Sequence, residues 1–319
     1  MSTWQLPEGI DELTGDKALV FESIRRQLID LYVEKGFNLV IPPMVENVES
    51  LLLTSDSVNE KTFKFLDPVS GKMLGVHADI TPQIARIDAK KDSGKVEKYC
   101  YINAILQTKA DDFYASRSPI QAGAELYGSD DIDADVEVIE LMLESLKLLT
   151  ISPIALSLGN VAIFDALIES ESLDDEQAMT LRQIFVKRSV PDLSVFLSDN
   201  ALKNPEKFSA LITLEGDASV LEEALILFED FPQAKTAIED LVRINAQLSN
   251  ANVQVVLDLG ELKTYEYHTG VIFSAYNEHY SKALAQGGRY NGLSASFGQS
   301  RAATGFSFDL KFLSKKQNN

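Results

Sequence analysis

Cysteine and histidine are scarce in this sequence, with one and three copies among 319 residues. A single cysteine cannot form a disulfide within the chain. These four side chains also lack metal-ligand spacings such as Cys-x-x-Cys or His-Glu-x-x-His. We therefore expect a reduced, cytoplasmic protein without structural zinc or any other cofactor. Cys100, inside KYCYI, is predicted to be a small buried side chain rather than a nucleophile.

Positive charge is also in short supply. Lysine and arginine number 29 against 48 aspartates and glutamates, which gives a net charge of −19. Such a chain repels nucleic acid unless a local basic patch overcomes the field. The densest basic pairs are only Lys90-Lys91, Arg25-Arg26 and Lys315-Lys316. Stable tRNA binding is therefore not expected.

Long apolar runs are missing as well. No stretch reaches the roughly 18 apolar residues that span a bilayer, and no basic segment followed by an apolar run opens the chain. We expect neither membrane insertion nor export. The 45% hydrophobic content over this length is enough for one large domain or two medium ones with true cores.

The chain begins with an amphipathic helix followed by a strand. Apolar residues three or four apart predict a helix over residues 16–36, which Thr14 or Asp16 can cap and Gly36 can end. A strand follows from Phe37 and ends at Pro42-Pro43, because proline removes ladder donors and forces extended geometry before it.

Further elements follow from alternation and turn residues. KTFKFLD and KMLGVHAD predict a hairpin, Pro82 suits the first turn of a helix, and EKYCYINAIL and PIQAGAELYG predict two strands. A helix is predicted over residues 133–149, then a short strand in PIALSLG. Strands return in VQVVLDLG, YEYHTGVIFSAY and SKALAQGG, with a final helix around SFDLKFL.

The middle of the chain has a different pattern. Residues 163–250 predict mainly helices, which we interpret as an inserted helical subdomain whose acidic clusters are solvated faces. The core is then formed by residues 1–162 and 251–319. The predicted fold class is α+β, with a mostly antiparallel sheet flanked by helices.

One strand carries a candidate ligand site. In PIQAGAELYG the two-residue period places Gln121, Gly123, Glu125 and Tyr127 on one face, where the glycine leaves room for a small ammonium ligand. The alternative is that Gln121 and Glu125 simply face water. In VHADITPQIAR, Asp79 and Thr81 lie at a strand-to-helix junction, where capping is the default role.

Two later segments carry weaker signals. In YEYHTGVIF, an aromatic phenol beside His268 can line a slot for a planar hydrogen-bonding group, although a packing histidine is the more general reading. In GGRYNG, Arg289 beside a glycine turn can hold an anion, but a turn between sheet and helix explains the hexamer equally well.

Together these segments resemble the catalytic core of a class II histidyl-tRNA synthetase. The shared order is a first-motif helix and strand, then HADIT, QAGAELYG, YEYHTGVIF, GGRYNGL and ATGFSFDL, over residues 5–160 and 250–313. The resemblance implies the class II synthetase-like fold and a homodimer interface at the first motif.

The departures from that family concern its arginines. The resemblance places arginines that hold the nucleotide or precede the ligand-binding tyrosines at three positions, which are here Asn103 (or its neighbour Ile102), Lys263 and Lys311. Lysine keeps the charge but loses the planar two-pronged donor set. Losing one preorganised donor commonly costs about a hundredfold to a thousandfold in rate, so three changes predict almost no adenylation. The sequence also ends ten residues after Asp309, without the anticodon-binding domain of that family.

This combination resembles the regulatory subunits of short-form ATP phosphoribosyltransferase. The resemblance implies a non-catalytic subunit that activates the first step of histidine biosynthesis and carries feedback inhibition by L-histidine. It implies a homodimer within a larger assembly with the short catalytic subunit, which by family resemblance is a hetero-octamer. Carried over by motif, the histidine-binding residues are Asp79, Thr81, Gln121, Glu125, Tyr267 and His268, with Arg117 a weaker candidate from the loop.

Two alternatives stay open from the sequence. The first is an active synthetase-like adenylating enzyme, which ATP–pyrophosphate exchange with histidine detects. The second is a scaffold with a vestigial pocket, for which histidine causes no thermal shift although a partner still co-purifies.

Overall fold

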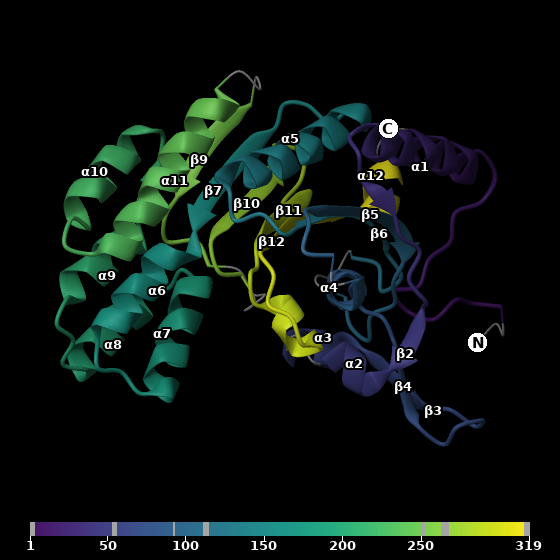
Figure 1. Ribbon diagram of the computed structural model, residues 1–319, viewed down its shortest axis with the longest axis horizontal. Coiled ribbons are helices and arrows are strands. Elements are labelled where there is room, and N and C mark those ends of the chain that lie inside the picture. Colours follow the sequence, from purple (N-terminus) through teal and green to yellow (C-terminus); the bar gives the residue numbers. More distant parts are fainter. Residues whose placement is uncertain are drawn as a thin grey trace. The chain divides into compact units, whose positions relative to one another are not determined.

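A computed structural model describes residues 4–52, 56–91, 93–110, 115–249, 253–262 and 268–315. The chain forms two compact units (Figure 1). Unit 1 comprises Met1–Asp130, Leu141–Ser152 and Asn291–Asn319, and unit 2 comprises Asp131–Glu140 and Pro153–Tyr290. Helix α5 (Ile132–Leu148) has residues in both.

Unit 1 contains most of the elements that the terminal motifs predicted. In chain order they are α1 (Gly15–Glu34), β1 (Asn38–Leu39), β2 (Val45–Asn47), α2 (Val48–Leu52), α3 (Asp56–Lys61), β3 (Phe63–Leu66), β4 (Met73–Val76), α4 (Thr81–Lys91), β5 (Glu97–Ala104), β6 (Ile120–Tyr127), η1 (Leu293–Phe297), β12 (Ala303–Asp309) and α12 (Leu310–Ser314).

The main sheet of unit 1 has the strand order β1-β5-β6-β12. Strand β1 is parallel to β5, whereas β5, β6 and β12 pair antiparallel. Strands β2, β4 and β3 form a separate small sheet. Its β3–β4 hairpin has the predicted turn, in which Asp67 accepts hydrogen bonds from the main-chain N–H of Val69 and Ser70.

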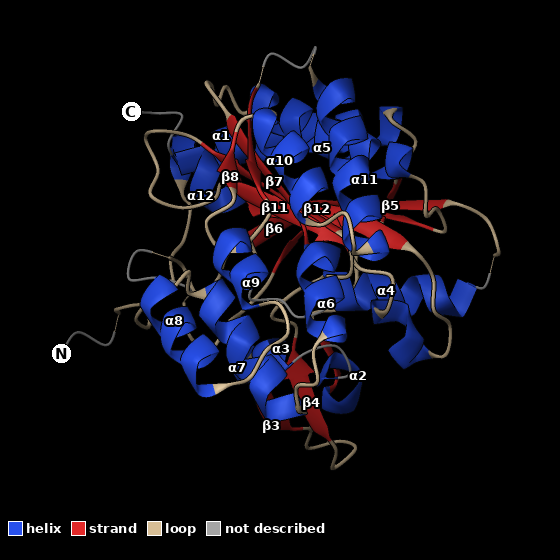
Figure 2. Ribbon diagram, turned by 90° about the vertical axis from the view of Figure 1, so that its left-hand side faces the viewer, coloured by secondary structure: helices blue, strands red, loops and turns tan. Residues whose placement is uncertain are grey.

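Unit 2 has the strand order β11-β10-β7-β9-β8, in which only β7 and β9 are parallel. Its helices α6 to α9 lie together in Figure 2. The elements are β7 (Ala155–Asn160), α6 (Val161–Ser170), α7 (Asp175–Val186), α8 (Val190–Asp199), α9 (Pro205–Leu211), β8 (Glu215–Gly216), α10 (Ser219–Leu227), α11 (Pro232–Leu248), β9 (Gln254–Asp258), β10 (Val271–Tyr276) and β11 (Ala285–Arg289).

The predicted start of the final helix was wrong. Ser307, Phe308 and Asp309 belong to strand β12, and the final helix begins only at Leu310, where Asp309 caps it by accepting from Phe312 N. Pairing with β6 keeps this segment extended despite its apolar spacing. The short strand β8 was not predicted. The inserted subdomain over residues 163–250 stays a prediction, since the compact units divide the chain at other residues.

Helix α1 supplies much of the core of unit 1. Leu28 and Tyr32 are fully buried on its inner face, as the apolar spacing predicts. The ring of Tyr32 meets Phe306 of β12 edge to face at 6.3 Å, and its hydroxyl accepts from Ser145 Oγ at 3.2 Å. The helix and the sheet therefore share one core. No described helix is long and apolar enough to cross a membrane.

Replacing Leu28 by alanine should lower the free energy of unfolding by about 2–5 kcal/mol, because it opens a cavity in this core. The matched control is Leu19→Ala on the same helix. Leu19 is 71% exposed, so its change should stay within about 0.5 kcal/mol. Urea unfolding of both variants measures the difference, and equal losses would contradict the assigned face of α1.

Candidate functional site

Strand β6 and the start of α4 bring four predicted site residues together in unit 1. Gln121 and Glu125 lie on the same face of β6, two positions either side of Gly123. Asp79 and Thr81 reach this face from the connection between β4 and α4. All four side chains are at least nine-tenths buried, so they do not simply face water.

Glu125 is the centre of this group. Its Oε1 accepts hydrogen bonds from Thr81 Oγ1 at 2.8 Å and from the hydroxyl of Tyr101 at 3.0 Å. The residue is only 1% exposed. A carboxylate removed from water needs such donors or a cation, because its desolvation is costly. The two hydroxyls orient the carboxylate over the sheet.

Gln121 fixes the other carboxylate. Its Nε2 donates to Asp79 Oδ1 at 2.8 Å, and its Oε1 accepts from Ile80 N at 3.0 Å. These opposite partners define the orientation of the amide. Asp79 Oδ1 also accepts from Thr81 N at 3.3 Å, so the predicted capping role and the predicted site coexist. Two buried carboxylates, those of Asp79 and Glu125, are thus preorganised beside β6.

Two glycines make room for these groups. In the antiparallel register Gly305 of β12 lies opposite Glu125, and a Cβ there would approach Glu125 Oε2 to 1.6 Å. A Cβ on Gly123 would meet the Tyr101 hydroxyl and the carbonyl oxygen of Phe306, each at 2.5 Å. Neither position has space for a side chain. Gly123 of QAGAELYG therefore leaves room above the sheet, and the side chain of Tyr101 fills it.

Tyr101 was missed by the sequence reasoning. It is fully buried on β5, opposite Gly123, and its hydroxyl also lies 3.4 Å from Thr81 Oγ1. Burial, with the charges of Glu125 and Asp79, raises the pKa of Tyr101 well above its usual range, so the hydroxyl stays a donor. The alternation in KYCYI contained the signal. Cys100, its neighbour, is fully buried as predicted, and burial raises the pKa of its thiol to about 12.

The residues predicted for an imidazole slot are described only in part. Tyr267 and Lys263 lie outside the described residues. His268 belongs to unit 2, where it is half-buried, and its Cδ2 would lie 2.7 Å from a Cβ on Gly288. It precedes β10 rather than lying within it. Its predicted place on the alternating face of a strand is therefore wrong, and its ligand role stays a prediction.

Arg289 is engaged in a buried ion pair. Its Nε and Nη2 lie 3.0 and 2.8 Å from Asp135 Oδ2, and Nη2 also donates to the carbonyl oxygen of Asp131 at 3.1 Å. Asp135 is fully buried. This acidic partner supports the turn reading of GGRYNG over the anion-holding one, since the guanidinium already has its counter-charge.

Asn103 and Arg117 contact the main chain. Asn103 Nδ2 donates weakly to Pro42 O at 3.4 Å. Arg117 donates from Nε to Gln107 O and from Nη1 to Glu8 O, each at 3.1 Å, and its guanidinium lies 5.3 Å from the centre of the Phe63 ring. These contacts tie Arg117 to the amino-terminal segment. Its predicted ligand contact, like the lost-arginine assignment of Asn103, stays a prediction.

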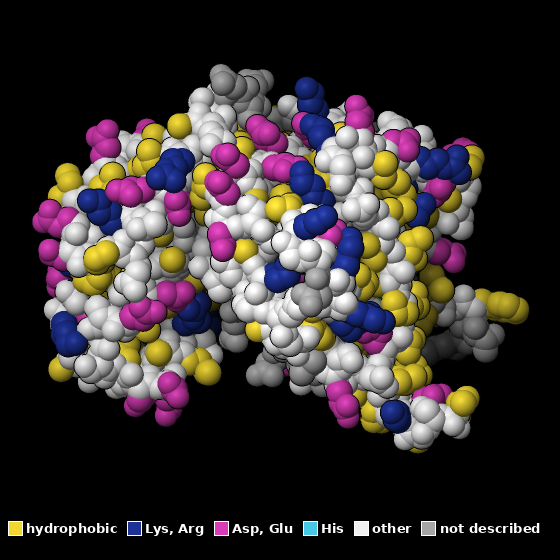
Figure 3. Space-filling view, viewed as in Figure 1, with side chains coloured by type: hydrophobic (Ala, Val, Ile, Leu, Met, Phe, Trp, Pro, Cys, Tyr) yellow, Lys and Arg dark blue, Asp and Glu magenta, His cyan; other side chains and the backbone are white. Residues whose placement is uncertain are grey.

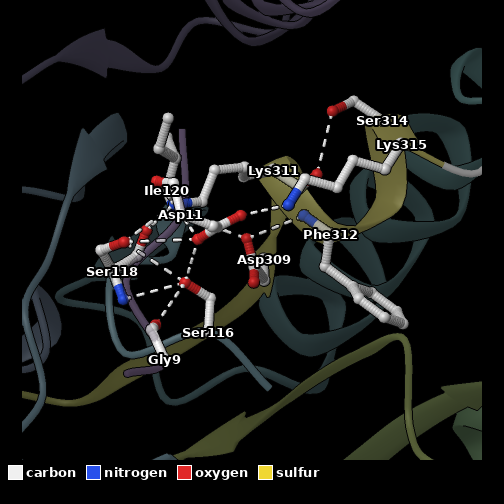
Figure 4. A network of polar contacts seen from close by, with 10 residues as sticks. All are labelled: Gly9, Asp11, Ser116, Ser118, Ile120, Asp309, Lys311, Phe312, Ser314 and Lys315. Carbon is white, nitrogen blue, oxygen red and sulfur yellow. Dashed lines mark hydrogen bonds and ion pairs between the residues drawn. The ribbon is translucent and has the colours of Figure 1, made fainter. Parts of the chain in front are cut away.

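Lys311 likewise forms an ion pair and hydrogen bonds within unit 1 (Figure 4). Its Nζ lies 2.8 Å from Asp11 Oδ1 and 3.1 Å from Ser118 Oγ, and its side chain is only 6% exposed. Lys315, the C-cap residue of α12, pairs with Asp11 Oδ2, and Ser116 donates to Oδ1. The lysine that replaces a predicted nucleotide-holding arginine thus holds the amino-terminal segment through Asp11.

This network changes the acid–base behaviour of Asp11. Burial by itself raises its pKa, but the hydrogen bonds from Lys311, Lys315 and Ser116 outweigh burial and hold the pKa well below its usual range. The carboxylate therefore stays ionised at neutral pH. Among the described residues, no group of three or more His, Cys, Asp or Glu side chains is arranged to hold a metal ion.

Comparison with known proteins places these motifs in a family context. A family model described as histidyl-tRNA synthetase matches residues 9–313. A curated relative, the ATP phosphoribosyltransferase regulatory subunit of Thiobacillus denitrificans, is 39% identical over 98% of this chain and 98% of its own length.

Solved structures agree with the predicted fold class. The ATP phosphoribosyltransferase regulatory subunit/histidyl-tRNA synthetase from Bacillus halodurans C has a TM-score of 0.89 at 25% identity, covering 99% of this chain and 83% of that one. The ATP phosphoribosyl transferase (HisG:HisZ) complex from Thermotoga maritima has a TM-score of 0.67 at 18% identity, covering 92% and 97%. The latter likeness concerns the fold alone. The predicted class II synthetase-like α+β fold is confirmed.

Gly305→Ala should destabilise the protein by about 1–3 kcal/mol, because the new methyl group displaces the Glu125 carboxylate from its two hydroxyl donors. Gly292→Ala is the matched control, since a Cβ there meets nothing within 4 Å. Thermal unfolding compares the two. A Gly305 variant as stable as the control would contradict the close approach of β12 to Glu125.

Asp11→Asn should cost about 1 kcal/mol of stability at pH 7, a size that allows for solvent screening of a partly exposed ion pair. Because the pKa of Asp11 is depressed in the fold, its contribution is present above the ordinary aspartate pKa of about 4 and is lost as the pH falls towards the folded value. Urea unfolding from pH 7 to 3 should show the wild-type advantage shrinking. Asp230→Asn, at an exposed position, is the control, and a constant difference would contradict the assignment.

Proposed function

The chain belongs to the histidyl-tRNA synthetase family and, within it, to the ATP phosphoribosyltransferase regulatory subunits, and on this premise we propose that it senses L-histidine for a short-form catalytic subunit. Its own role is regulatory and not catalytic, in histidine biosynthesis. The ligand site we propose for the α-ammonium group of histidine consists of Asp79, Thr81, Gln121 and Glu125.

The observation that carries this proposal is the preorganised set of acceptors beside β6. An ammonium group has three N–H donors and one positive charge, and it matches two buried carboxylates with a hydroxyl between them. Thr81 and Gln121 orient Glu125 and Asp79 through hydrogen bonds within the fold. Binding then requires little reordering of side chains, which favours affinity.

The imidazole end of the ligand is assigned to Tyr267 and His268 by the family motif. Phenol and imidazole groups can exchange hydrogen bonds with a planar ligand ring. His268 is described in unit 2 and keeps partial exposure. We propose Arg117 as a weaker candidate for a ligand contact from the loop, because its guanidinium already donates to the main-chain carbonyls of Gln107 and Glu8.

The absence of adenylation and of tRNA binding completes the proposal. Lys311 is held by Asp11 and Ser118, and an anion would have to compete with that carboxylate. The net charge of −19 opposes a nucleic-acid partner. A histidine pocket without activation chemistry reports the concentration of histidine. We expect this to occur in the cytoplasm, without a cofactor.

Assembly is proposed as a homodimer within a hetero-oligomer, an octamer by family resemblance. The segment after α1 supports the homodimer, because Leu39, Ile41, Met44 and Val45 are 37–73% exposed there. Figure 3 shows hydrophobic side chains along the right-hand margin of unit 1. Such apolar exposure is typical of a surface that another subunit covers.

Feedback then needs only modest energies. Histidine binding with a dissociation constant on the order of 10–100 μM corresponds to about 5.5–7 kcal/mol. A coupling of about 1–3 kcal/mol between the ligand site and the partner interface changes the binding affinity at each by about five- to 150-fold. The site does not need to be unusually tight.

Gln121→Ala and Glu125→Ala should each weaken histidine binding by about a hundredfold or more while leaving activation of the catalytic subunit intact. The first frees Asp79 from its donor, and the second removes a charge that faces the ammonium group. Calorimetry measures binding. The phosphoribosyltransferase rate of the mixed subunits, with and without histidine, measures activation and feedback.

Glu223→Ala, at an exposed position of α10, is the matched control and should behave as wild type. Undiminished histidine binding in both site variants would overturn the site assignment. A wild-type chain that activates the catalytic subunit but binds no histidine would overturn the sensing proposal itself.

A further inference from the structure

His77 lies between β4 and α4 in unit 1 and is fully buried. Both of its ring nitrogens have close oxygen neighbours. Nδ1 lies 2.6 Å from Gln83 Oε1, and Nε2 lies 2.7 Å from the carbonyl oxygen of Ala104 on β5. Both distances are short for hydrogen bonds from nitrogen to oxygen. The ring therefore bridges α4 and β5.

The orientation of the Gln83 amide is fixed by its other contacts. Its Nε2 lies 2.8 Å from Pro43 O and 2.8 Å from Glu46 Oε1, both of which are acceptors. Exchanging the two amide atoms would turn Oε1 towards these two oxygens and lose both hydrogen bonds. The atom that faces His77 is therefore the amide oxygen, which only accepts.

A neutral imidazole has one N–H and one lone pair, so it can satisfy only one of two acceptors. With a lone pair pointed at a carbonyl oxygen, the buried contact becomes repulsive and both acceptors cannot be served. We infer that His77 is held as a doubly protonated imidazolium, and that in this form it positions the Asp79–Thr81 segment of the ligand site.

The charged groups around His77 are consistent with this form. Glu46 of β2 reaches the ring through Gln83, and Arg86 of α4 holds the same carboxylate from Nη2 at 2.6 Å and Nε at 3.1 Å. Asp79 follows two residues later in the same connection, and β5 contributes a main-chain carbonyl. Arg86 compensates the charge of Glu46, so the two acceptor oxygens at the ring are what favours the doubly protonated form.

The ring controls the connection that carries the ligand residues. The main chain of His77 is already fixed, since its N donates to Met44 O at 3.0 Å and its O accepts from Leu106 N at 3.2 Å. The ring adds attachments to α4 and β5 immediately before Asp79 and Thr81. His77 is therefore a positioning residue, and the part of this inference that concerns histidine binding rests on the proposed function.

The sign of the pH effect follows from the hydrogen bonds. Both attachments are present when the ring carries two protons, and one is lost when it carries one. Loss of one ring proton therefore removes stability and ligand affinity that His77 contributes. The lost hydrogen bond corresponds to about a tenfold weaker histidine affinity.

The protonation state can be measured without any ligand. The chain has only three histidines, at positions 77, 268 and 279, so imidazole nitrogen spectra of the labelled full chain are readily assigned from His77→Gln and His279→Gln variants. We expect two protonated nitrogens at His77 at pH 6.5. A neutral tautomer at His77 at pH 6.5 would overturn the inference.

Affinity for L-histidine is then measured by calorimetry between pH 6.5 and 8.5 in wild type, His77→Gln, His77→Arg and His279→Gln. Titration of the ligand itself is common to all four. His77→Arg keeps a charge with several N–H donors. Its affinity for L-histidine should therefore change about tenfold less over this pH range than that of wild type, whereas His77→Gln should bind weakly throughout. Equal pH dependence in wild type and His77→Arg would overturn the positioning role.

Failure of the two ideas is distinguishable. If wild type binds no histidine, the proposed function fails, but the nitrogen spectra still test the charge of His77. The pH dependence of urea unfolding tests the attachments in the same way, with His77→Arg losing less stability than wild type as the pH rises. His77→Arg and wild type losing stability equally would again overturn the inference.

Discussion

The carboxylate of Glu125 is buried over the sheet, and much of unit 1 is arranged around that constraint. It needs the hydroxyls of Thr81 and Tyr101 because water no longer solvates it. It needs a glycine at position 305 of the neighbouring strand, because a methyl group there would clash with the carboxylate. The register of β6 with β12, the start of α4 and the position of β5 all follow from holding one charge in one place.

Pairing of basic side chains with carboxylates inside the fold also distinguishes this chain from an activating enzyme. Lys311, which the family resemblance matches to an arginine position, has partners within the fold. Lys311 contacts Asp11 and Ser118, so the amino-terminal segment and α12 are joined by a partly buried ion pair. Arg289 is likewise paired with Asp135. Lys311 and Arg289, which the motifs assign to anion binding, form ion pairs within the folded chain.

Local patterns predicted most elements of the fold. The spacing of Leu28 and Tyr32 predicted the buried face of α1, and the alternation in QAGAELYG predicted the face that Gln121 and Glu125 share. Local pattern failed at Ser307 to Asp309, where apolar spacing suggested a helix but pairing with β6 forms a strand. Strand pairing is a long-range contact, and single-sequence periodicity does not contain it.

The sequence by itself determined the family resemblance, the acidic character that opposes nucleic acid, and four residues that meet at the candidate ammonium site. Only the tertiary structure decided their partners: Tyr101 above Gly123, Gly305 beneath Glu125, and two acceptors on either side of His77. The physical reason is that periodicity specifies which way a side chain points. Its hydrogen-bond partners come from strands and helices distant in sequence, and these partners determine charge and orientation.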